Sequence, residues 1–443
     1  MAPLLPTSDF PSIIVQCLVQ FPTVVAPIVV SRAEHTISRS QIDPDALKVL
    51  YRLNQQQYLA YLVGGSVRDL LLGRKPKDFD ISTSAHPSQV KRLFRNCWII
   101  GRRFRLVHVK FGAKIVEVAT FRRKVSAAEA EAALEAAGAG SEEGSTPRPR
   151  VYHDNTFGTP EEDAFRRDFT LNALFYDIGT FSIIDYTGGL ADLRAGVIRC
   201  IGDPDERFVE DPVRMLRAVA LEARLDFRID LPILEAIERR RLEMARSAPP
   251  RLIEEFYKIL RAGVSARTFR GLRETGLLEA IAPELQFRAS DALWQSLTAL
   301  DAYRRRLTTP DTLTNAILLG SLLVPLGLRA HQREDAPVGL GALPLARRDM
   351  ERLRQILQLQ RRLVADAAGP TRVRRGLLHR TAFAEALTWL DVHGDTPQIV
   401  EAWRTMAAEA VGGHRPAGEP DDAPPRRRRR RRRRSRRPNP PPA

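Results

Sequence analysis

The sequence predicts an α+β protein, with a mixed α/β domain in the first half of the chain and only helices in the second. Up to residue 200, short apolar runs that indicate strands alternate with short amphipathic stretches. Beyond that point the strand signals fade and long amphipathic segments follow one another. The chain has 443 residues, of which 44% are hydrophobic and 28% charged, a composition typical of a globular protein with more than one core.

The net charge of +16 comes mostly from the C-terminus, where the arginines between positions 426 and 437 supply 11 positive charges. Such a tail contacts polyanions without reading their sequence. A solvated tail without a partner is the alternative. Three widely spaced cysteines, Cys17, Cys97 and Cys200, provide neither a disulfide framework nor a zinc ribbon, which favours a reducing cytoplasm.

The first 43 residues are expected to form a partly disordered leader. Residues 10–31 are uncharged and partly apolar, but prolines interrupt them and no Lys or Arg precedes them. A signal peptide requires such a basic start, and a membrane span requires an unbroken apolar run. We therefore expect no stable membrane insertion.

The mixed domain is expected over residues 44–200. Its elements should follow in this order: a helix from Pro44, a buried strand over 58–63, a helix over 67–72 that ends at Gly73, a strand over 79–81, a helix over 87–94, and β-rich stretches over 106–111 and 114–121. Residues 126–150 are rich in Ala, Glu, Gly and Pro, which predicts a flexible surface insertion.

The helical half follows from apolar residues at helical spacing. The predicted helices cover residues 212–225, 251–260, 266–281, 291–306, 312–323, 347–368 and 381–393. After residue 411 all periodicity is lost, which predicts a linker and tail.

Asp78-Phe79-Asp80 is the sharpest local feature. Residues two apart on a strand point to the same face, so both carboxylates would converge there, whereas on a helix they would diverge. Two acids beside a third can bind two Mg²⁺ ions about 3.5–4 Å apart. The alternative is a solvated strand end. Gly64 and Gly65 lie just upstream at a strand-to-helix junction, where backbone N–H groups can receive a triphosphate.

The third acid has two candidates. Glu117 is a lone charge in an otherwise apolar strand, and such a residue usually faces a site or solvent. Asp168 follows Arg166 and Arg167, whose guanidinium groups can fork onto phosphate or ribose oxygens. A structural ion pair is the alternative for each acid.

Glu210-Asp211-Pro212-Val213-Arg214 opens a helix with an N-cap acid and a proline in its first turn. Asp211, Arg214 and Arg217 fall three apart, on one face of this helix. An aspartate acceptor and an arginine donor could match the Watson–Crick edge of a nucleotide base. A plain helix cap is the alternative.

In order and spacing these motifs resemble the conserved blocks of the class II nucleotidyltransferases, which comprise bacterial poly(A) polymerases and CCA-adding tRNA nucleotidyltransferases. The resembling blocks are 62–69, 78–80, 166–173 and 210–214, and the resemblance extends over residues 28–285. It implies a polymerase-β-like nucleotidyltransferase head with a mixed sheet over 44–200 and a helical neck over 201–265. It also implies a helical body over 266–411 that holds RNA, and a disordered Arg-rich tail over 412–443.

The resemblance also implies residue roles. The catalytic residues would be Asp78, Asp80 and Asp168, and the metal ligands Asp78, Asp80 and Glu117. The nucleotide would be bound by Gly64, Gly65, Arg68, Arg167, Asp211, Arg214 and Arg217. The cofactor would be Mg²⁺ in a two-metal site, with ATP as substrate.

Residues 99–109 and the arginine-rich tail resemble the poly(A) polymerase branch of the family. We therefore expect a cytoplasmic, template-independent poly(A) polymerase that adds AMP from ATP to RNA 3′ ends with release of pyrophosphate. It would act in RNA processing and decay, beside RNA-decay protein partners, and its tail would hold RNA phosphates. The alternatives are a CCA-adding tRNA nucleotidyltransferase, which shares every catalytic motif, and a non-catalytic RNA-binding protein.

Overall fold

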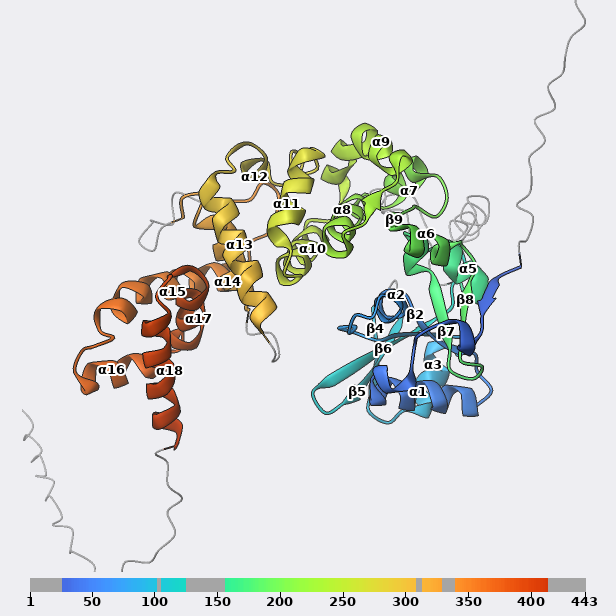
Figure 1. The fold of residues 1–443 in the computed structure, drawn as a ribbon, viewed down its shortest axis with the longest axis horizontal. Coiled ribbons are helices and arrows are strands. Elements are labelled where there is room, and N and C mark those ends of the chain that lie inside the picture. The colour runs from blue at the N-terminus through green and yellow to red at the C-terminus, as the bar shows by residue number, and fades with distance from the viewer. Residues whose placement is uncertain (1–25, 102–104, 125–155, 308–312, 329–338, 413–443) are drawn as a thin grey trace, which may run out of the picture. The chain divides into compact units, whose positions relative to one another are not determined.

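The computed structural model describes residues 26–101, 105–124, 156–307, 313–328 and 339–412, in two compact units, residues 1–358 and 359–443 (Figure 1). The predicted insertion over 126–150, most of the predicted leader and the tail after residue 412 lie outside the described residues. The boundary between the units falls inside helix α15 (Arg347–Ala365), within the stretch that the sequence predicts as one helical body. The amphipathic pattern of α15 continues across this boundary, so periodicity alone does not mark it.

An eight-stranded mixed sheet forms the core of the first unit. Its strands are β1 (Ile28–Val30), β2 (Ala60–Val63), β3 (Asp80–Thr83), β4 (Cys97–Ile100), β5 (Leu106–Phe111), β6 (Lys114–Thr120), β7 (Leu174–Asp177) and β8 (Ser182–Asp185). Their order across the sheet is β1-β8-β7-β2-β3-β6-β5-β4. Neighbouring strands run antiparallel except β3 and β6, which run parallel. The four strand stretches expected from apolar runs correspond to β2, β3, β5 and β6.

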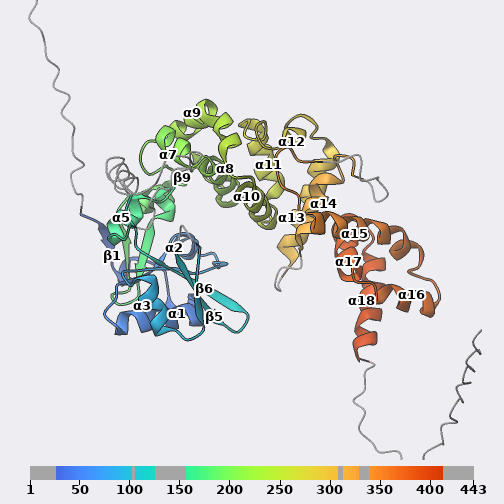
Figure 2. The ribbon, with the colours of Figure 1, turned by 180° about the vertical axis from the view of Figure 1, so that it is seen from behind.

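The two faces of the sheet differ in what covers them. Helices α1 (Pro44–Gln55) and α3 (Pro87–Leu93) lie beside each other on one face, over the buried side chains of Leu62 and Ile81 (Figures 1 and 2). On the other face, Tyr61, Val63 and Phe175 pack with residues of helix α5 (Pro160–Phe165) and its neighbours. Towards β6 this second face carries Asp80 and Glu117 instead of apolar side chains.

Residues 28–43 belong to the sheet domain, which corrects the predicted leader boundary at residue 43. Strand β1 pairs antiparallel with β8 at the edge of the sheet. Ile37 and Ile42 are almost fully buried. The sequence concealed this because the apolar residues here are isolated anchors and form no periodic run.

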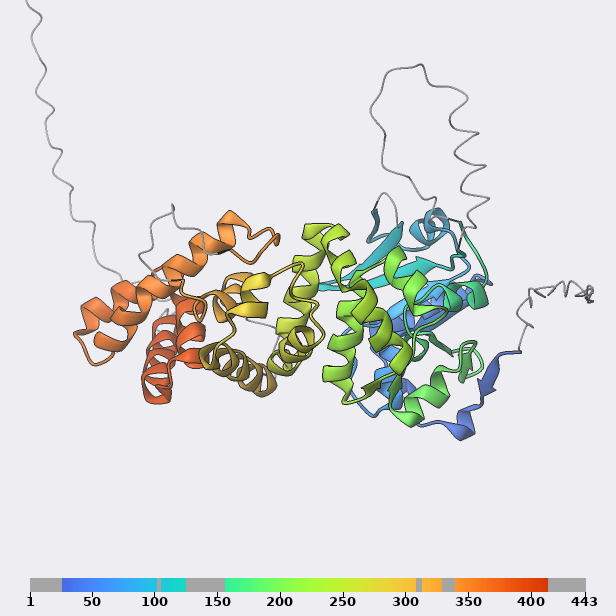
Figure 3. The ribbon, with the colours of Figure 1, turned by 90° about the horizontal axis from the view of Figure 1, so that it is seen from above.

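Helices dominate the first unit after residue 200. They are α7 (Pro204–Glu210), α8 (Val213–Leu225), α9 (Leu231–Arg240), α10 (Pro249–Arg261), α11 (Ser265–Glu274), α12 (Pro283–Phe287), α13 (Asp291–Arg306) and α14 (Asn315–Leu323). Helices α2 (Gly65–Leu71) and α6 (Gly189–Ala195) precede them, with a two-stranded sheet of β9 (Val197–Ile198) and β10 (Arg228–Ile229). Figure 3 shows this helical stretch, coloured green to yellow, as a row of packed helices.

Aromatic contacts and glycines shape this helical row. Phe256 of α10 meets Phe269 of α11 with their ring centroids 5.3 Å apart. Helix α11 ends earlier than predicted, because Gly276 adopts a φ of +70° that turns the chain out of the helix.

The second unit consists of the end of α15 with α16 (Thr371–Leu378), α17 (Phe383–His393) and α18 (Pro397–Gly412). The fully buried Trp403 donates a hydrogen bond from its indole N–H to the carbonyl of Leu363 and packs edge-on against Phe383. Within the described part of the chain, no helix is both long and apolar enough to cross a membrane.

Candidate functional site

Asp80 and Glu117 stand side by side on neighbouring strands. In the parallel register Ile81 pairs with Val118, so the preceding residues, Asp80 and Glu117, are the next pair and share a face of the sheet. Asp78 precedes β3, which begins at Asp80. Asp78 lies within electrostatic reach of Asp80, and its predicted alignment with Asp80 on one face stays a prediction.

The charge environment of Asp80 is unfavourable for its ionised form. The residue is exposed as a whole, but its carboxylate lies among atoms at the sheet surface. This burial raises the pKa of Asp80 to about 6, with further contributions from Glu117 and Asp78, while Arg167 opposes the shift. A carboxyl group whose pKa is raised in this way, on a part of the sheet face that no helix of the described residues covers, marks a candidate functional site.

The two candidates for the third acid lie in different places. Glu117 lies next to Asp80, and its Oε1 is 3.3 Å from the Nε2 of His108 on β5. Asp168 contacts other groups: it accepts hydrogen bonds from the side chain of Asn172 at 3.2 Å and from the N–H of Phe169, and its Oδ2 is 3.6 Å from Arg217. The described residues contain no group of three or more His, Cys, Asp or Glu side chains arranged to hold a metal ion.

Arg167 crosses the sheet face beside the acids. It donates to Asp163 at 2.9 Å and to the hydroxyl of Ser82 at 3.3 Å, and its guanidinium lies 5.4 Å from the ring centre of Phe175. Burial alone would raise the pKa of Asp163, but the adjacent Arg167 and Arg166 lower it. Asp163 thereby holds both guanidinium groups of the arginine pair, and Arg167 supplies a positive charge that favours the ionised form of Asp80.

The glycine turn meets Arg167 directly. Gly64 has a φ of +73° and caps α2, and a Cβ at this position would lie 3.2 Å from a terminal nitrogen of Arg167. A side chain there would be strained and would displace the guanidinium, so the turn requires glycine. Gly65 begins α2 directly after it.

Arg68 is buried inside the first unit. It donates two hydrogen bonds to Asp69, at 2.7 and 2.9 Å, and one to the side-chain oxygen of Asn172 at 2.5 Å. Asp69 in turn accepts from Arg224 on α8 at 2.5 Å. In this arrangement Arg68 connects α2 to the segment that follows Asp168. The predicted contact of Arg68 with a nucleotide stays a prediction.

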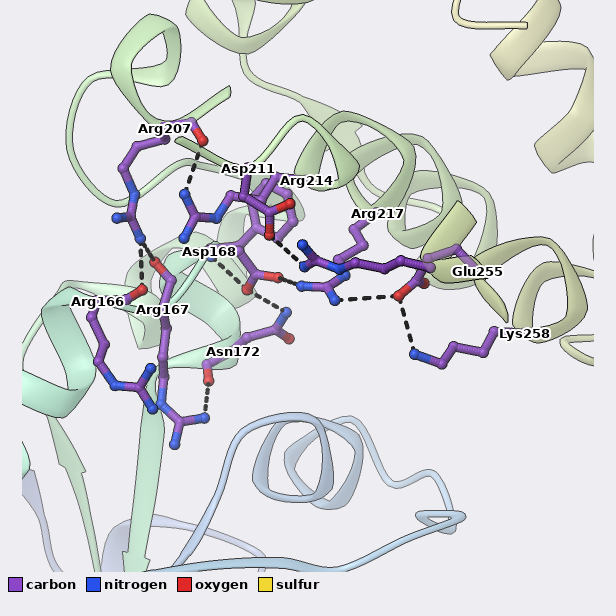
Figure 4. A network of polar contacts seen from close by, with 12 residues as sticks. Arg166, Arg167, Asp168, Asn172, Arg207, Asp211, Arg214, Arg217, Glu255 and Lys258 are labelled. Atoms are coloured by element: carbon purple, nitrogen blue, oxygen red, sulfur yellow. Dashed lines mark hydrogen bonds and ion pairs between the residues drawn. The ribbon is translucent and has the colours of Figure 1, made fainter. Parts of the chain in front are cut away.

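Three predicted base-selecting residues, Asp211, Arg214 and Arg217, lie in the network of Figure 4. Asp211 caps the end of α7 and directly precedes α8, where its carbonyl accepts a hydrogen bond from the N–H of Arg214, and it lies within electrostatic reach of Arg217. Its Oδ2 accepts from Arg251 at 2.6 Å, and its buried Oδ1 has no hydrogen-bond partner among the described residues.

The two arginines of α8 have different partners. Arg214 donates to Glu210 at 2.7 Å and to the carbonyl of Arg207 at 2.9 Å. Arg217 lies between Asp168 and Glu255, at 3.6 and 3.2 Å. Arg217 is therefore the residue by which α8 reaches the Asp168 segment (Figure 4).

Sequence reasoning missed two residues of this site. The buried Arg207 donates to the carbonyls of Arg166 and Arg167, at 2.7 and 2.5 Å, and to Glu210 at 2.6 Å. Asn172 links Asp168 to Arg68. Asn172 lies within the motif that follows Arg166 and could have been chosen as a polar residue among apolar ones, whereas nothing in its local sequence distinguishes Arg207.

The segment predicted to mark the poly(A) branch, residues 99–109, includes the end of β4 and the first part of β5. Strand β4 is the edge of the sheet, and residues 102–104 lie outside the described residues. His108, on β5, faces Glu117. The β5 part of the segment therefore lies two strands from Asp80, and the β4 part three.

Two protein-family models match separate parts of this chain. Residues 60–199 match the family described as the poly A polymerase head domain, and residues 226–288 match the probable RNA and SrmB-binding site of polymerase A. Poly(A) polymerase I of Salmonella typhi is 49% identical over 257 residues, which are 58% of this chain and 54% of that protein. Poly(A) polymerase I of Haemophilus influenzae is 45% identical over 258 residues.

CCA-adding enzymes are also similar. That of Lactobacillus helveticus is 35% identical over 58% of this chain and 63% of its own length. The crystal structure of the Bacillus stearothermophilus CCA-adding enzyme in complex with CTP matches 85% of this chain and 90% of that chain, with a TM-score of 0.58 and 27% identity. The chain spans about half the length of the curated poly(A) polymerases that it matches.

Proposed function

The chain carries the head and RNA-binding domains of the class II nucleotidyltransferase family, and on this premise we propose that it is a template-independent poly(A) polymerase. It transfers AMP from ATP to an RNA 3′-hydroxyl and releases pyrophosphate. The observation that carries the proposal is the pair Asp80 and Glu117 beside Arg167, on the open face of a nucleotidyltransferase sheet. The 45–49% identity to poly(A) polymerases supports adenylate as the product.

Mg²⁺ fits the acidic side chains. This ion is usually bound through one or two carboxylates and completed by substrate phosphates, and Asp80 and Glu117 provide two adjacent carboxylates with Asp78 nearby. Asp78, Asp80 and Glu117 would hold the metal. When bound, it would neutralise the triphosphate and lower the pKa of the attacking hydroxyl.

The chain's own side chains would position the nucleotide. Arg167 lies beside Asp80 and can donate to a phosphate or ribose oxygen, and the Gly64 turn lets a triphosphate approach the backbone. From α8, Arg214 and Arg217 would meet the base, with Asp211 as acceptor. Arg214 and Arg217 now bind carboxylates, so an incoming nucleotide competes with Glu210 and Glu255 for them. Asp168 would orient Arg217 within the catalytic centre.

The cellular setting belongs to the same proposal. The partners are RNA 3′ ends, with the basic tail on RNA phosphates, and RNA processing and decay in the cytoplasm is the process served. Cys97 and Cys200 are both free thiols, which agrees with a reducing compartment.

CCA addition to tRNA is the second candidate, because the CTP-bound relative covers most of the chain at 27% identity. An extension assay with Mg²⁺ separates the two. Each nucleotide is offered singly to an unstructured RNA and to a tRNA lacking its CCA end. We expect long, heterogeneous tails with ATP alone.

Use of CTP followed by a single A, with growth then stopping, would establish the CCA-adding activity instead. Asp80→Asn is the control for the assay, because extension that persists in this variant does not depend on the acidic site. Absence of extension with every nucleotide, together with retained RNA binding, would show a non-catalytic RNA-binding protein.

A further inference from the structure

A groove with a volume of about 420 Å³ opens on the first unit, away from the acidic site. Helix α1 contributes Arg52, the turn after α3 contributes Phe94, Arg95 and Asn96, and β5 contributes its segment up to Phe111. The volume falls within the range of about 300–1,000 Å³ that is usual for small-ligand pockets.

The groove lies on the opposite face of the sheet from the acids. Successive residues of a strand point to opposite faces. His108 shares the face of Glu117, so Val109, which lines the groove, points to the other side. A ligand in the groove would therefore take no part in the chemistry at Asp80.

The charge of the groove is positive and uncompensated. None of its lining residues is acidic. Arg52 and Arg95 are exposed, and neither has an ion pair within the described residues. The nearby carboxylates of Asp45 and Asp43 are already bound to Lys48 and Lys114, so they do not neutralise the two arginines.

Aromatic rings lie beside these charges. The guanidinium of Arg52 lies over the half-buried ring of Phe94, 5.7 Å from its centre, and Phe111 is half-buried at the other end of the groove. Guanidinium groups bind phosphates, and a partly exposed ring can stack a nucleotide base. An acidic peptide would engage the arginines alone and leave the rings unused, so a nucleic acid matches both features.

We propose that this groove is a second binding site for single-stranded RNA on the head, with phosphates on Arg52 and Arg95 and a base against Phe94. The identity of the ligand as RNA rests on the proposed function. The test measures RNA binding without nucleotide, so a failure of this site is distinguishable from a failure of polymerase activity.

The experiment compares the full chain with Arg52→Gln/Arg95→Gln, by fluorescence anisotropy of a labelled single-stranded RNA over a salt series. Two lost phosphate contacts should weaken binding several-fold and make the slope of log K against log salt shallower by about 1.4, at about 0.7 for each phosphate of a single strand. Arg32→Gln/Arg194→Gln removes the same charge from exposed positions elsewhere on the head and should leave the slope unchanged.

Phe94→Leu tests the ring separately. It keeps the apolar volume and all charges, so the affinity should fall at least about fivefold with an unchanged salt slope. Wild-type RNA binding by both groove variants would overturn the proposal, and so would an equal effect of the control pair. Competition by poly-glutamate that is lost in Arg52→Gln/Arg95→Gln, with RNA binding intact, would overturn it in favour of an acidic protein partner.

Discussion

Asp80 is held in a position that costs the folded protein stability. Its carboxylate lies among protein atoms and near Glu117 and Asp78, and its pKa is raised from 3.8 to about 6. Above that pH the folded state carries an ionised group that the unfolded chain solvates better. This is the behaviour expected of a group that is kept for binding a cation.

Asp80→Asn should therefore stabilise the metal-free protein at pH 7, by about 1 kcal/mol, because solvent at this exposed residue screens most of a two-unit shift. Since the folded pKa lies above the unfolded one, the cost is fully present above pH 6 and disappears below pH 3.8. The gain should thus shrink as the pH falls through this window. Thermal unfolding in a chelating buffer at several pH values measures it.

Glu235→Gln, an exposed carboxylate of α9, provides the matched control and should change little at any pH. Adding Mg²⁺ should stabilise the wild type more than Asp80→Asn and reverse their order. Equal stability of the two proteins in chelator across the whole range would contradict the assigned environment of Asp80.

At the scale of elements, α7 fastens the loop that carries the arginine pair. Arg207 of α7 is buried, and burial lowers its pKa, with the nearby Arg214 adding to the effect. Its donors satisfy the carbonyls of Arg166 and Arg167. The contact between α8 and α2, from Arg224 to Asp69, involves a half-exposed arginine and an acid that keeps Arg68 as a partner.

These two links should differ in strength. Arg207→Gln leaves two part-buried carbonyls without these donors and should cost about 2–4 kcal/mol, since each unsatisfied buried group costs about 1–3 kcal/mol. Arg224→Gln removes the half-exposed partner of the buried Asp69, whose other oxygen keeps its hydrogen bonds from Arg68, and should cost about 1–2 kcal/mol. Urea unfolding followed by circular dichroism compares them, and equal losses would show that burial of Arg207 contributes nothing to the link.

Helices and strands with a clear local hydrophobic pattern could be predicted from the sequence. Short strands that depend on pairing with a distant strand could not. Helix α13 begins and ends at its predicted residues, because an amphipathic pattern of that length defines a helix by itself. Strands β1 and β4 are only three and four residues long and lie at the edges of the sheet. Their pairing depends on β8 and β5, which a local pattern does not contain.

The same distinction applies to the site. The motifs at Gly64, Asp80 and Asp168 could be read locally; the fold that they predict is confirmed, and residues 60–199 match the poly A polymerase head domain. Which acid accompanies Asp80 depends on the register of β3 against β6, a contact between distant segments. The burial of Arg68 likewise results from Asp69 and Asn172 closing around it.

For the whole molecule, we expect the arginine-rich tail and the folded part to divide RNA binding and nucleotide choice between them. Truncation after Pro425 removes 11 positive charges. It should weaken RNA binding about equally for all sequences and flatten its salt dependence, by about 0.7 in slope for each lost phosphate contact. Filter binding over a salt series measures the first effect, and the extension assay measures nucleotide preference.

The preference for ATP should remain unchanged, because the residues proposed to meet the base lie on α8 and at the end of α7. A truncated protein that incorporates a different nucleotide would contradict this assignment. The Arg32→Gln/Arg194→Gln variant serves again as a control, since two charges lost from the head surface should not reproduce the effect of the tail.

The parallel pair of β3 and β6, the one parallel junction within the described eight-stranded sheet, also decides when the two acids meet. Strands β5 and β6 form a hairpin that can close early, and β2 and β3 are connected through helix α2. The junction of β3 with β6 unites these two strand pairs. Asp80 and Glu117 are apart in a chain that lacks this junction, so a partly folded chain without it has no paired acids, and acquisition of metal affinity during refolding should coincide with the pairing of β3 with β6.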